Sequence, residues 1–256
     1  MLSRWFRRVS ATVATRSFAG PAGQRLYAVG DIHGRLDLLN DLLGQIEADL
    51  AERPVTTASV IFLGDLIDRG PDSAGVIERL RGLDGPFPAR PLFLLGNHEE
   101  IFLRVLDAEP GIAYDWLGFG GDACAESYGV AAAALQAMDE DRVAAVLRAA
   151  IPPAHLAFLR GFGDSVAFGD FLLVHAGIRP GVPIADQQPH DLRWIRRPFL
   201  TDEHDHGCMV VHGHTVSDGV DRRPNRLGID TGAYRTGVLT AAVIEGEDLR
   251  FLATGG

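Results

Sequence analysis

Cysteine, long apolar runs and excess positive charge are all scarce in this 256-residue chain. Its two cysteines, Cys124 and Cys208, lie far apart without the paired spacing of a disulfide framework, which favours reduced thiols. No apolar stretch approaches the roughly 20 residues that cross a bilayer. The formal net charge of -10 argues against nucleic acid as the main partner, because a phosphate backbone requires a broad basic face. We therefore expect a cytoplasmic protein whose partner is neither a membrane nor a nucleic acid.

The first two dozen residues differ in composition from the rest of the chain. They contain arginines but no acidic residue, and Gly20-Pro21-Ala22-Gly23 separates them from the first apolar run. We predict a flexible basic tail over residues 1–24, with a mitochondrial transit peptide as the alternative. Residues 25–256 have a length that suits a single α/β domain.

Three polar phrases follow apolar runs that have the pattern of buried strands. They are Gly30-Asp31-Ile32-His33-Gly34, Gly64-Asp65-Leu66-Ile67-Asp68-Arg69-Gly70 and Gly96-Asn97-His98-Glu99. The glycines allow the backbone to turn sharply and to pass close to a bound group. Polar side chains placed at strand ends in this way are typical of a binding site rather than of a core.

Six side chains in this pattern are of the kinds that bind metal ions. They are Asp31, His33, Asp65, Asn97, His175 and His214, and the last two also follow apolar runs. Six ligands suit two metals, and Asp65 on the middle strand is the natural bridge between ions roughly 3.5–4 Å apart. Mixed oxygen and nitrogen ligands favour manganese, iron or zinc over a thiolate zinc site or a calcium site.

The order of these phrases, with His175-Ala176-Gly177 and Gly213-His214-Thr215, resembles the metallophosphoesterases of the phosphoprotein phosphatase family. The likeness is greatest to their compact bacterial, calcineurin-like members and extends over residues 26–254. A single such phrase is a weak signal, whereas five in the family's order are specific. The resemblance implies a four-layer α/β/β/α sandwich and a phosphatase that contains two divalent ions, with manganese preferred.

The resemblance also implies how such a site would work. A water shared by the two ions would be deprotonated near neutral pH and would attack phosphorus in line, without a covalent intermediate. His98 would give a proton to the leaving oxygen, and Asp68 would orient the imidazole. An alternative for Asp68 is that it only caps its turn.

Two arginines are implied to bind the phosphoryl oxygens, with Asn97 beside them at the substrate. Arg69 follows Asp68 directly, and its guanidinium can contact two oxygens at once. The second arginine lies in a stretch that resembles the Trp-x-Arg segment of bacterial members, which favours Arg196 over Arg193 or Arg197.

The periodicity changes from helical in the first half of the chain to hairpin-like in the second. Helices are predicted over residues 36–50, 72–80 and 99–106, where Glu99 and Glu100 suit the helix dipole and need no catalytic role. From residue 165 onward, Gly169-Asp170 predicts a hairpin, followed by strands at 227–230, 238–244 and 249–253. Two sheets should therefore pack face to face.

Between these halves, residues 110–151 are predicted to form a helical cap insertion. An alanine-rich helix is expected over residues 130–150. Tyr114, Trp116 and Tyr128 could either form the rim of a substrate pocket or pack the cap onto the sandwich. In the first case this region decides the substrate.

Three functions remain open on the sequence. The first is hydrolysis of phosphate monoesters, with phosphoserine and phosphothreonine of proteins foremost among the substrates. The second is hydrolysis of dinucleoside polyphosphates, such as diadenosine tetraphosphate, or of other nucleotides. A binding module without catalysis is disfavoured, because the set of ligands, acid and arginines is complete.

The other histidines receive less weight. His204 and His206 flank Asp205 in a polar loop, where a surface position is expected. His155 and His190 have no ligand partners nearby in the sequence. His212 is left as a group behind the ligands or facing the substrate.

Overall fold

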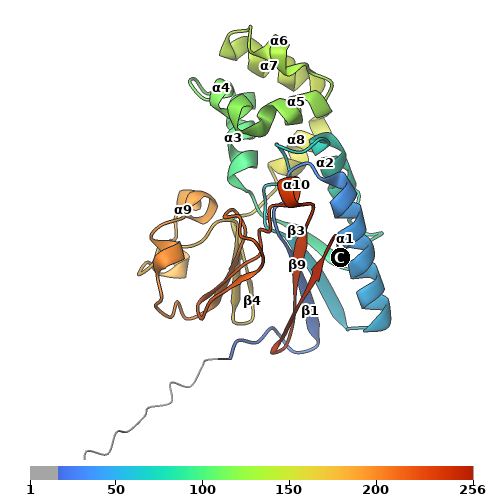
Figure 1. Ribbon diagram of the computed structural model, residues 1–256, viewed down its shortest axis with the longest axis vertical. Coiled ribbons are helices and arrows are strands. Elements are labelled where there is room, and N and C mark those ends of the chain that lie inside the picture. The colour runs from blue at the N-terminus through green and yellow to red at the C-terminus, as the bar shows by residue number, and fades with distance from the viewer. Residues whose placement is uncertain (1–16, 256) are drawn as a thin grey trace, which may run out of the picture.

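The computed structural model describes residues 17–255, and within these residues two five-stranded sheets pack face to face (Figure 1). The first sheet has the order β10 (Asp248–Ala253), β9 (Thr240–Glu245), β1 (Gln24–Val29), β2 (Thr57–Phe62) and β3 (Arg90–Phe93). The second has the order β4 (Ser165–Phe168), β5 (Phe171–Val174), β6 (Met209–His212), β8 (Arg226–Gly228) and β7 (Asp221–Arg222). Apolar side chains from both inner faces form one buried cluster, which includes Leu26, Ile61, Leu173 and Val211.

The central strands of each sheet are parallel, which brings their carboxyl ends to one edge. β1 pairs with β2 and β2 with β3 in parallel, and β5, β6 and β8 do the same in the second sheet. The turns after these strands therefore meet at one end of the sandwich, as is general for binding sites in α/β sheets. All of the predicted ligands lie in these turns.

Helices cover the outer faces and complete the four layers. On the first sheet, α1 (Leu36–Glu52) buries Leu39, Leu42, Leu43 and Ile46, as its helical spacing predicts, and α2 (Ser73–Arg81) lies beside it. α3 (Asn97–Leu106) begins directly at the third polar phrase. On the second sheet, α9 (Pro189–Trp194) and the short 3-10 turn Phe199–Thr201 cover β5 and β6. A second 3-10 turn, Ile184–Asp186, and the short α10 (Ala233–Thr236) lie in connections. The predicted sandwich is confirmed.

A group of short helices rises from one end of the sandwich, at the top of Figure 1. It comprises α4 (Ala113–Trp116), the π-turn η1 (Leu117–Gly121), α5 (Asp122–Ser127), α6 (Ala132–Leu135), α7 (Glu140–Ala150) and α8 (Pro153–Leu159). This helical cap shares the core of the first sheet, since Trp116, Leu135 and Leu147 are buried in the same cluster as Leu39 and Phe62.

The segment predicted to be helical over residues 130–150 contains two helices with a break between them. The alanine-rich stretch forms α6, and the chain then leaves the helix and starts α7 at a new N-cap, Asp139, whose carboxylate accepts from the Arg142 backbone N–H at 2.8 Å. The Asp139 cap satisfies a backbone N–H at the start of α7, and helix propensity alone does not predict such a new start.

Two further expectations concern the N-terminal tail and membrane-spanning helices. Residues 1–16 of the predicted basic tail lie outside the described residues, and β1 begins at Gln24. Among residues 17–255, no single helix is long and apolar enough to cross a membrane, while α7 and α8, bent by 105°, reach that length and composition only as a pair.

Candidate metal centre

Backbone strain is concentrated at the edge where the strand ends meet. Among the described residues, the non-glycine residues with positive φ are His33 (47°), Asp65 (49°), Asp68 (70°), Arg69 (64°), Ala108 (60°) and His214 (62°). All except Ala108 belong to the predicted site. Such backbone conformations cost of order 1–3 kcal/mol each and persist where the surrounding structure enforces them, which is common at functional sites.

Two glycines let these turns approach each other. A Cβ atom on Gly70 would lie 2.0 Å from the carbonyl oxygen of His33, and one on Gly96 would lie 2.2 Å from the Asp65 carboxylate. Any side chain at either position would therefore push two of the polar phrases apart.

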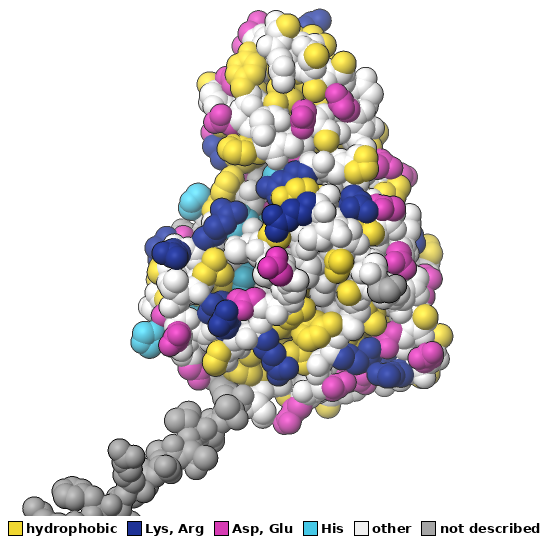
Figure 2. All heavy atoms as spheres, viewed as in Figure 1, with side chains coloured by type: hydrophobic (Ala, Val, Ile, Leu, Met, Phe, Trp, Pro, Cys, Tyr) yellow, Lys and Arg dark blue, Asp and Glu magenta, His cyan; other side chains and the backbone are white. Residues whose placement is uncertain are grey.

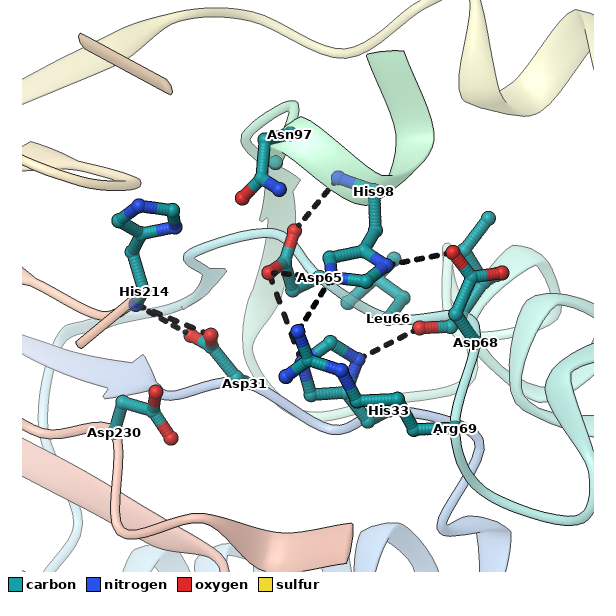
Figure 3. A network of polar contacts seen from close by, with 12 residues as sticks. Asp31, His33, Asp65, Leu66, Asp68, Arg69, Asn97, His98, His214 and Asp230 are labelled. Atoms are coloured by element: carbon teal, nitrogen blue, oxygen red, sulfur yellow. Dashed lines mark hydrogen bonds and ion pairs between the residues drawn. The ribbon is translucent and has the colours of Figure 1, made fainter. Parts of the chain in front are cut away.

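Asp65 lies at the centre of the site (Figure 3). Its Oδ1 accepts from the His98 backbone N–H at 3.0 Å and lies 3.4 Å from Nε2 of His175. Its Oδ2 lies 3.7 Å from Nε2 of His33 and 3.9 Å from Nε2 of His98. Two groups of ligand atoms thus share this carboxylate, Asp65 with His33 and His98, and Asp65 with His175 and His214.

The imidazoles are oriented for metal binding by their outer nitrogens. Nδ1 of His33 donates to the Ile67 carbonyl at 2.8 Å, and Nδ1 of His175 donates to the Leu63 carbonyl at 2.9 Å. Because a carbonyl only accepts, each Nδ1 carries a proton, and each Nε2 is the ring nitrogen that faces inward, where a cation would bind. Nε2 of His214 is buried and has no hydrogen-bond partner among the described residues. These features fit divalent cations.

The lowered pKa values of His33 and His214 agree with metal binding. Burial lowers the pKa of His33 to about 3, and burial with the nearby charge of His175 lowers the pKa of His214 to about 2. Both rings are therefore neutral at pH 7 and available as ligands. Burial alone would raise the pKa of Asp65, but the charges of His175 and His98 hold it well below its usual range.

Asp31 does not belong to either of these two groups of ligand atoms. Its two carboxylate oxygens accept from the His214 backbone N–H at 3.2 and 3.1 Å. Asp230 lies nearby (Figure 3). Burial, together with the negative charge of Asp230, raises the pKa of Asp31 well above the usual value. A cation would relieve this repulsion. The sequence reasoning missed Asp230, although it follows the apolar run of β8 as the ligands follow theirs.

Asn97 and Glu99 complete the inner site from the start of α3. Oδ1 of Asn97 lies 3.0 Å from Nε2 of His175. The fully buried Glu99 carboxylate accepts from four backbone N–H groups, those of Asp65, Leu66, Ile67 and Gly96, at 2.7 to 3.3 Å. Glu99 therefore holds the Asp65 turn in addition to lying where it suits the helix dipole. The spacing of three residues from Gly96 indicates only the bond to the Gly96 N–H, and not the three bonds to the Asp65 turn.

The predicted acid and its partner are in contact. Nδ1 of His98 lies 2.6 Å from Oδ2 of Asp68, which is completely buried. The Arg69 guanidinium reaches Nε2 of His98 at 2.9 Å and Nε2 of His33 at 3.0 Å, and it lies over the Tyr234 ring.

Two cavities of 280 Å³ each adjoin at this point. Their shared lining is Arg69, Asn97, His98 and Arg196. The first also includes Asp65, His214 and Tyr234, and the second is walled by Ile101, Phe119 and Trp194. Figure 2 shows arginines gathered where the narrow cap meets the broader sandwich.

For the cap aromatics, the structure decides between the pocket rim and the packing alternative. Trp116 is only 1% exposed, and the Tyr128 hydroxyl bonds to His155, so both pack the cap rather than form a pocket rim. Tyr114 is exposed but lines neither cavity. Phe119, which is 67% exposed, and Trp194 of α9 are the aromatic residues that line the second cavity.

The remaining histidines lie apart from the predicted ligands. His204 is 90% exposed, as expected, whereas the side chain of His206 is buried against Phe199, contrary to the surface prediction. They line a separate cavity of 570 Å³ that contains none of the predicted ligands. His212 is buried against the same phenyl ring, behind the ligands.

Comparison with known proteins places this site in a family. Residues 24–238 match the family of calcineurin-like phosphoesterases. The symmetrical bis(5'-nucleosyl)-tetraphosphatase of Methylococcus capsulatus is 33% identical over 155 residues, covering 60% of this chain and 44% of that protein. Serine/threonine-protein phosphatase 2 of Escherichia coli is 35% identical over 105 residues, covering 39% of each chain. The matches thus span less than half the length of these relatives.

Solved structures share the fold over nearly the whole chain. A crystal structure provisionally assigned as a diadenosine tetraphosphatase has a TM-score of 0.63 at 20% identity, covering 93% of this chain and all of that one. A serine/threonine phosphatase from Saccharomyces cerevisiae has a TM-score of 0.52 at 14% identity, covering 91% and 80%. The family match over residues 24–238 and the shared fold together show that this chain belongs to the calcineurin-like metallophosphoesterases.

Proposed function

We propose that the protein is a metal-dependent phosphatase that hydrolyses phosphate monoesters, with phosphoserine and phosphothreonine of proteins as its first candidate substrates. The observation that carries the proposal is the position of Asp65, whose two oxygens face separate imidazole groups beside a cavity lined by Arg69, His98 and Arg196. Its six proposed ligands are Asp31, His33, Asp65, Asn97, His175 and His214. Two divalent cations held there, manganese first and iron or zinc as alternatives, would supply a water acidic enough to act as nucleophile near neutral pH.

The side chains around the cavity provide the rest of the chemistry. Arg69 and Arg196 bind the phosphoryl oxygens and favour the transition state, where charge on those oxygens is common to all phosphate esters. The Arg69 guanidinium bonds to two imidazoles in this structure. The negatively charged oxygens of a bound phosphate are stronger acceptors and would take over these bonds.

His98 gives a proton to the leaving oxygen. Its Nδ1 is held by the buried Asp68, so its Nε2 points into the lining that both cavities share. A phosphoryl group in the first cavity would place its leaving group in the second, with His98 at the boundary between them. General acids placed in this way contribute about 10²–10⁴-fold to the rate.

A dinucleoside polyphosphate is the second candidate substrate. The aromatic walls of the second cavity, Phe119 and Trp194, can stack on a nucleobase, and Arg196 makes no ion pair among residues 17–255 and can take further phosphate charge. The relative from Methylococcus capsulatus is named as a hydrolase of this class.

Metal dependence is the first expected outcome. Chelation should abolish activity and manganese should restore it, and Asp65→Asn should lower the bound metal below the wild-type content, because one carboxylate serves both ion positions. Elemental analysis of dialysed protein measures the content, with the exposed Asp41→Asn as control. A fully active preparation without transition metal would contradict the proposal.

His98→Asn should separate protonation from binding. We expect kcat to fall by about 10²–10⁴ for an alkyl phosphate and far less for p-nitrophenyl phosphate, whose leaving group scarcely needs a proton. Steady-state kinetics on both esters measures the difference, with His204→Asn as an exposed control. Equal losses on the two esters would point to damage at the ligands rather than to an acid.

The second cavity should discriminate between the two candidate substrates. For a nucleotide hydrolase, Phe119→Ala and Trp194→Ala should each raise KM for diadenosine tetraphosphate by about tenfold, as expected for loss of one stacked base, and should change KM for a phosphopeptide far less. For a protein phosphatase the reverse holds. Tyr114→Ala, an exposed cap aromatic outside both cavities, is the matched control. If no KM moves, neither substrate uses this cavity.

A further inference from the structure

Residues 116–121 of the cap contact the turn that carries Asp68 and Arg69, beside Cys124 of α5, which also contacts Asp68. The Trp116 indole N–H donates to both carboxylate oxygens of Asp68, at 3.2 Å each. Four residues later, the carbonyl of Gly120 accepts from the backbone N–H of Arg69 at 2.9 Å. One segment of the cap therefore contacts the partner of the proposed acid and the backbone of a proposed phosphate-binding residue.

The indole is held rigidly where it makes this bond. Trp116 is 1% exposed, and its ring packs on Phe102 with 5.4 Å between ring centroids. The backbone of Gly121 passes so close that a Cβ atom there would lie 2.2 Å from the indole. Packing on both sides therefore fixes the direction of the N–H toward Asp68.

Besides the indole, the Asp68 carboxylate contacts His98 and the Cys124 thiol, and a thiol is only a weak donor. Asp68 is completely buried, its backbone has a left-handed φ of 70°, and its Oδ2 must face Nδ1 of His98 at 2.6 Å. A buried carboxylate that loses a donor is destabilised, because water cannot replace the bond. Its side chain would then be free to rotate away from the imidazole.

We propose that Trp116 is a positioning residue for His98, acting through Asp68. The indole N–H holds the carboxylate, the carboxylate holds Nδ1 of His98, and Nε2 of His98 is thereby directed at the leaving oxygen. This proposal rests on the proposed role of His98 as acid. The cap is then part of the catalytic apparatus, and Phe119 on the same segment faces the second cavity.

A spectroscopic measurement tests the first link without any turnover. The chain has three tryptophans, so its indole N–H resonances are few and can be assigned by substitution. The Trp116 resonance should lie downfield and exchange slowly with solvent, and Asp68→Ala should move it upfield while the half-buried Trp194 resonance stays in place. An unchanged Trp116 resonance in folded Asp68→Ala protein would overturn the proposal.

Kinetics of Trp116→Phe test the second link. Phenylalanine keeps most of the packing and removes the N–H, so kcat for an alkyl phosphate should fall by about tenfold, with KM, bound metal and kcat for p-nitrophenyl phosphate nearly unchanged. A purely structural role would lower kcat for both esters alike, and that result would overturn the proposal. If the variant does not fold, the indole resonance decides.

The same segment offers a contrasting pair of variants. Gly120 has a φ of 107°, and a Cβ atom there would lie 2.6 Å from the Arg69 side chain, whereas a Cβ on Gly118 would meet nothing within 4 Å. Gly120→Ala should therefore impair both esters, since the arginine serves every substrate, and Gly118→Ala should impair neither. Selective loss on the alkyl ester in Gly120→Ala would contradict this division of roles.

The outcomes separate this inference from the proposed function. If His98→Asn shows leaving-group selectivity and Trp116→Phe does not, the positioning role is wrong and the proposed acid stands. If His98→Asn itself shows no selectivity, the acid role fails and the positioning role fails with it. In the His98→Asn background, Trp116→Phe should cause no further selective loss, because the two residues act through one proton.

Discussion

The buried carboxylate of Asp65 is the constraint on which the rest of the site depends. Its two oxygens face different imidazole groups, one from the turns of the first sheet and one from the turns of the second. A charge buried in this way is unfavourable unless cations or donors surround it. The two sheets must therefore meet so that their strand ends converge on one carboxylate, and the glycines of the turns allow that approach.

The turn that carries Asp65 is itself held by other buried groups. Glu99 at the start of α3 binds the backbone N–H groups of the turn, so the third polar phrase supports the second. On the other side, the cap reaches Asp68 and Arg69 through Trp116 and Gly120. Side chains far apart in the sequence thus maintain a backbone that would relax if it were unsupported.

Much of this arrangement could be predicted from the sequence, because it depends on local patterns. Apolar runs followed by glycine and polar residues indicated the turns that contain Asp31 and Asp65, and leucine spacing indicated α1. The contacts of Trp116 and Glu99 could not be predicted in this way, since each depends on how one segment folds back onto another. The break before Asp139 was missed because alanine propensity outweighed a single capping residue. The sequence did not show that Trp116 would be buried and Phe119 exposed, because aromatic character does not reveal which face of a segment is buried.

Anomalous diffraction from crystals grown with manganese tests the central claim most directly. The account predicts two peaks at the manganese edge, one on each side of the Asp65 carboxylate and about 3.5–4 Å apart. The first should lie toward His33 and the second toward His175 and His214. A single peak, or peaks that do not contact Asp65, would contradict the account.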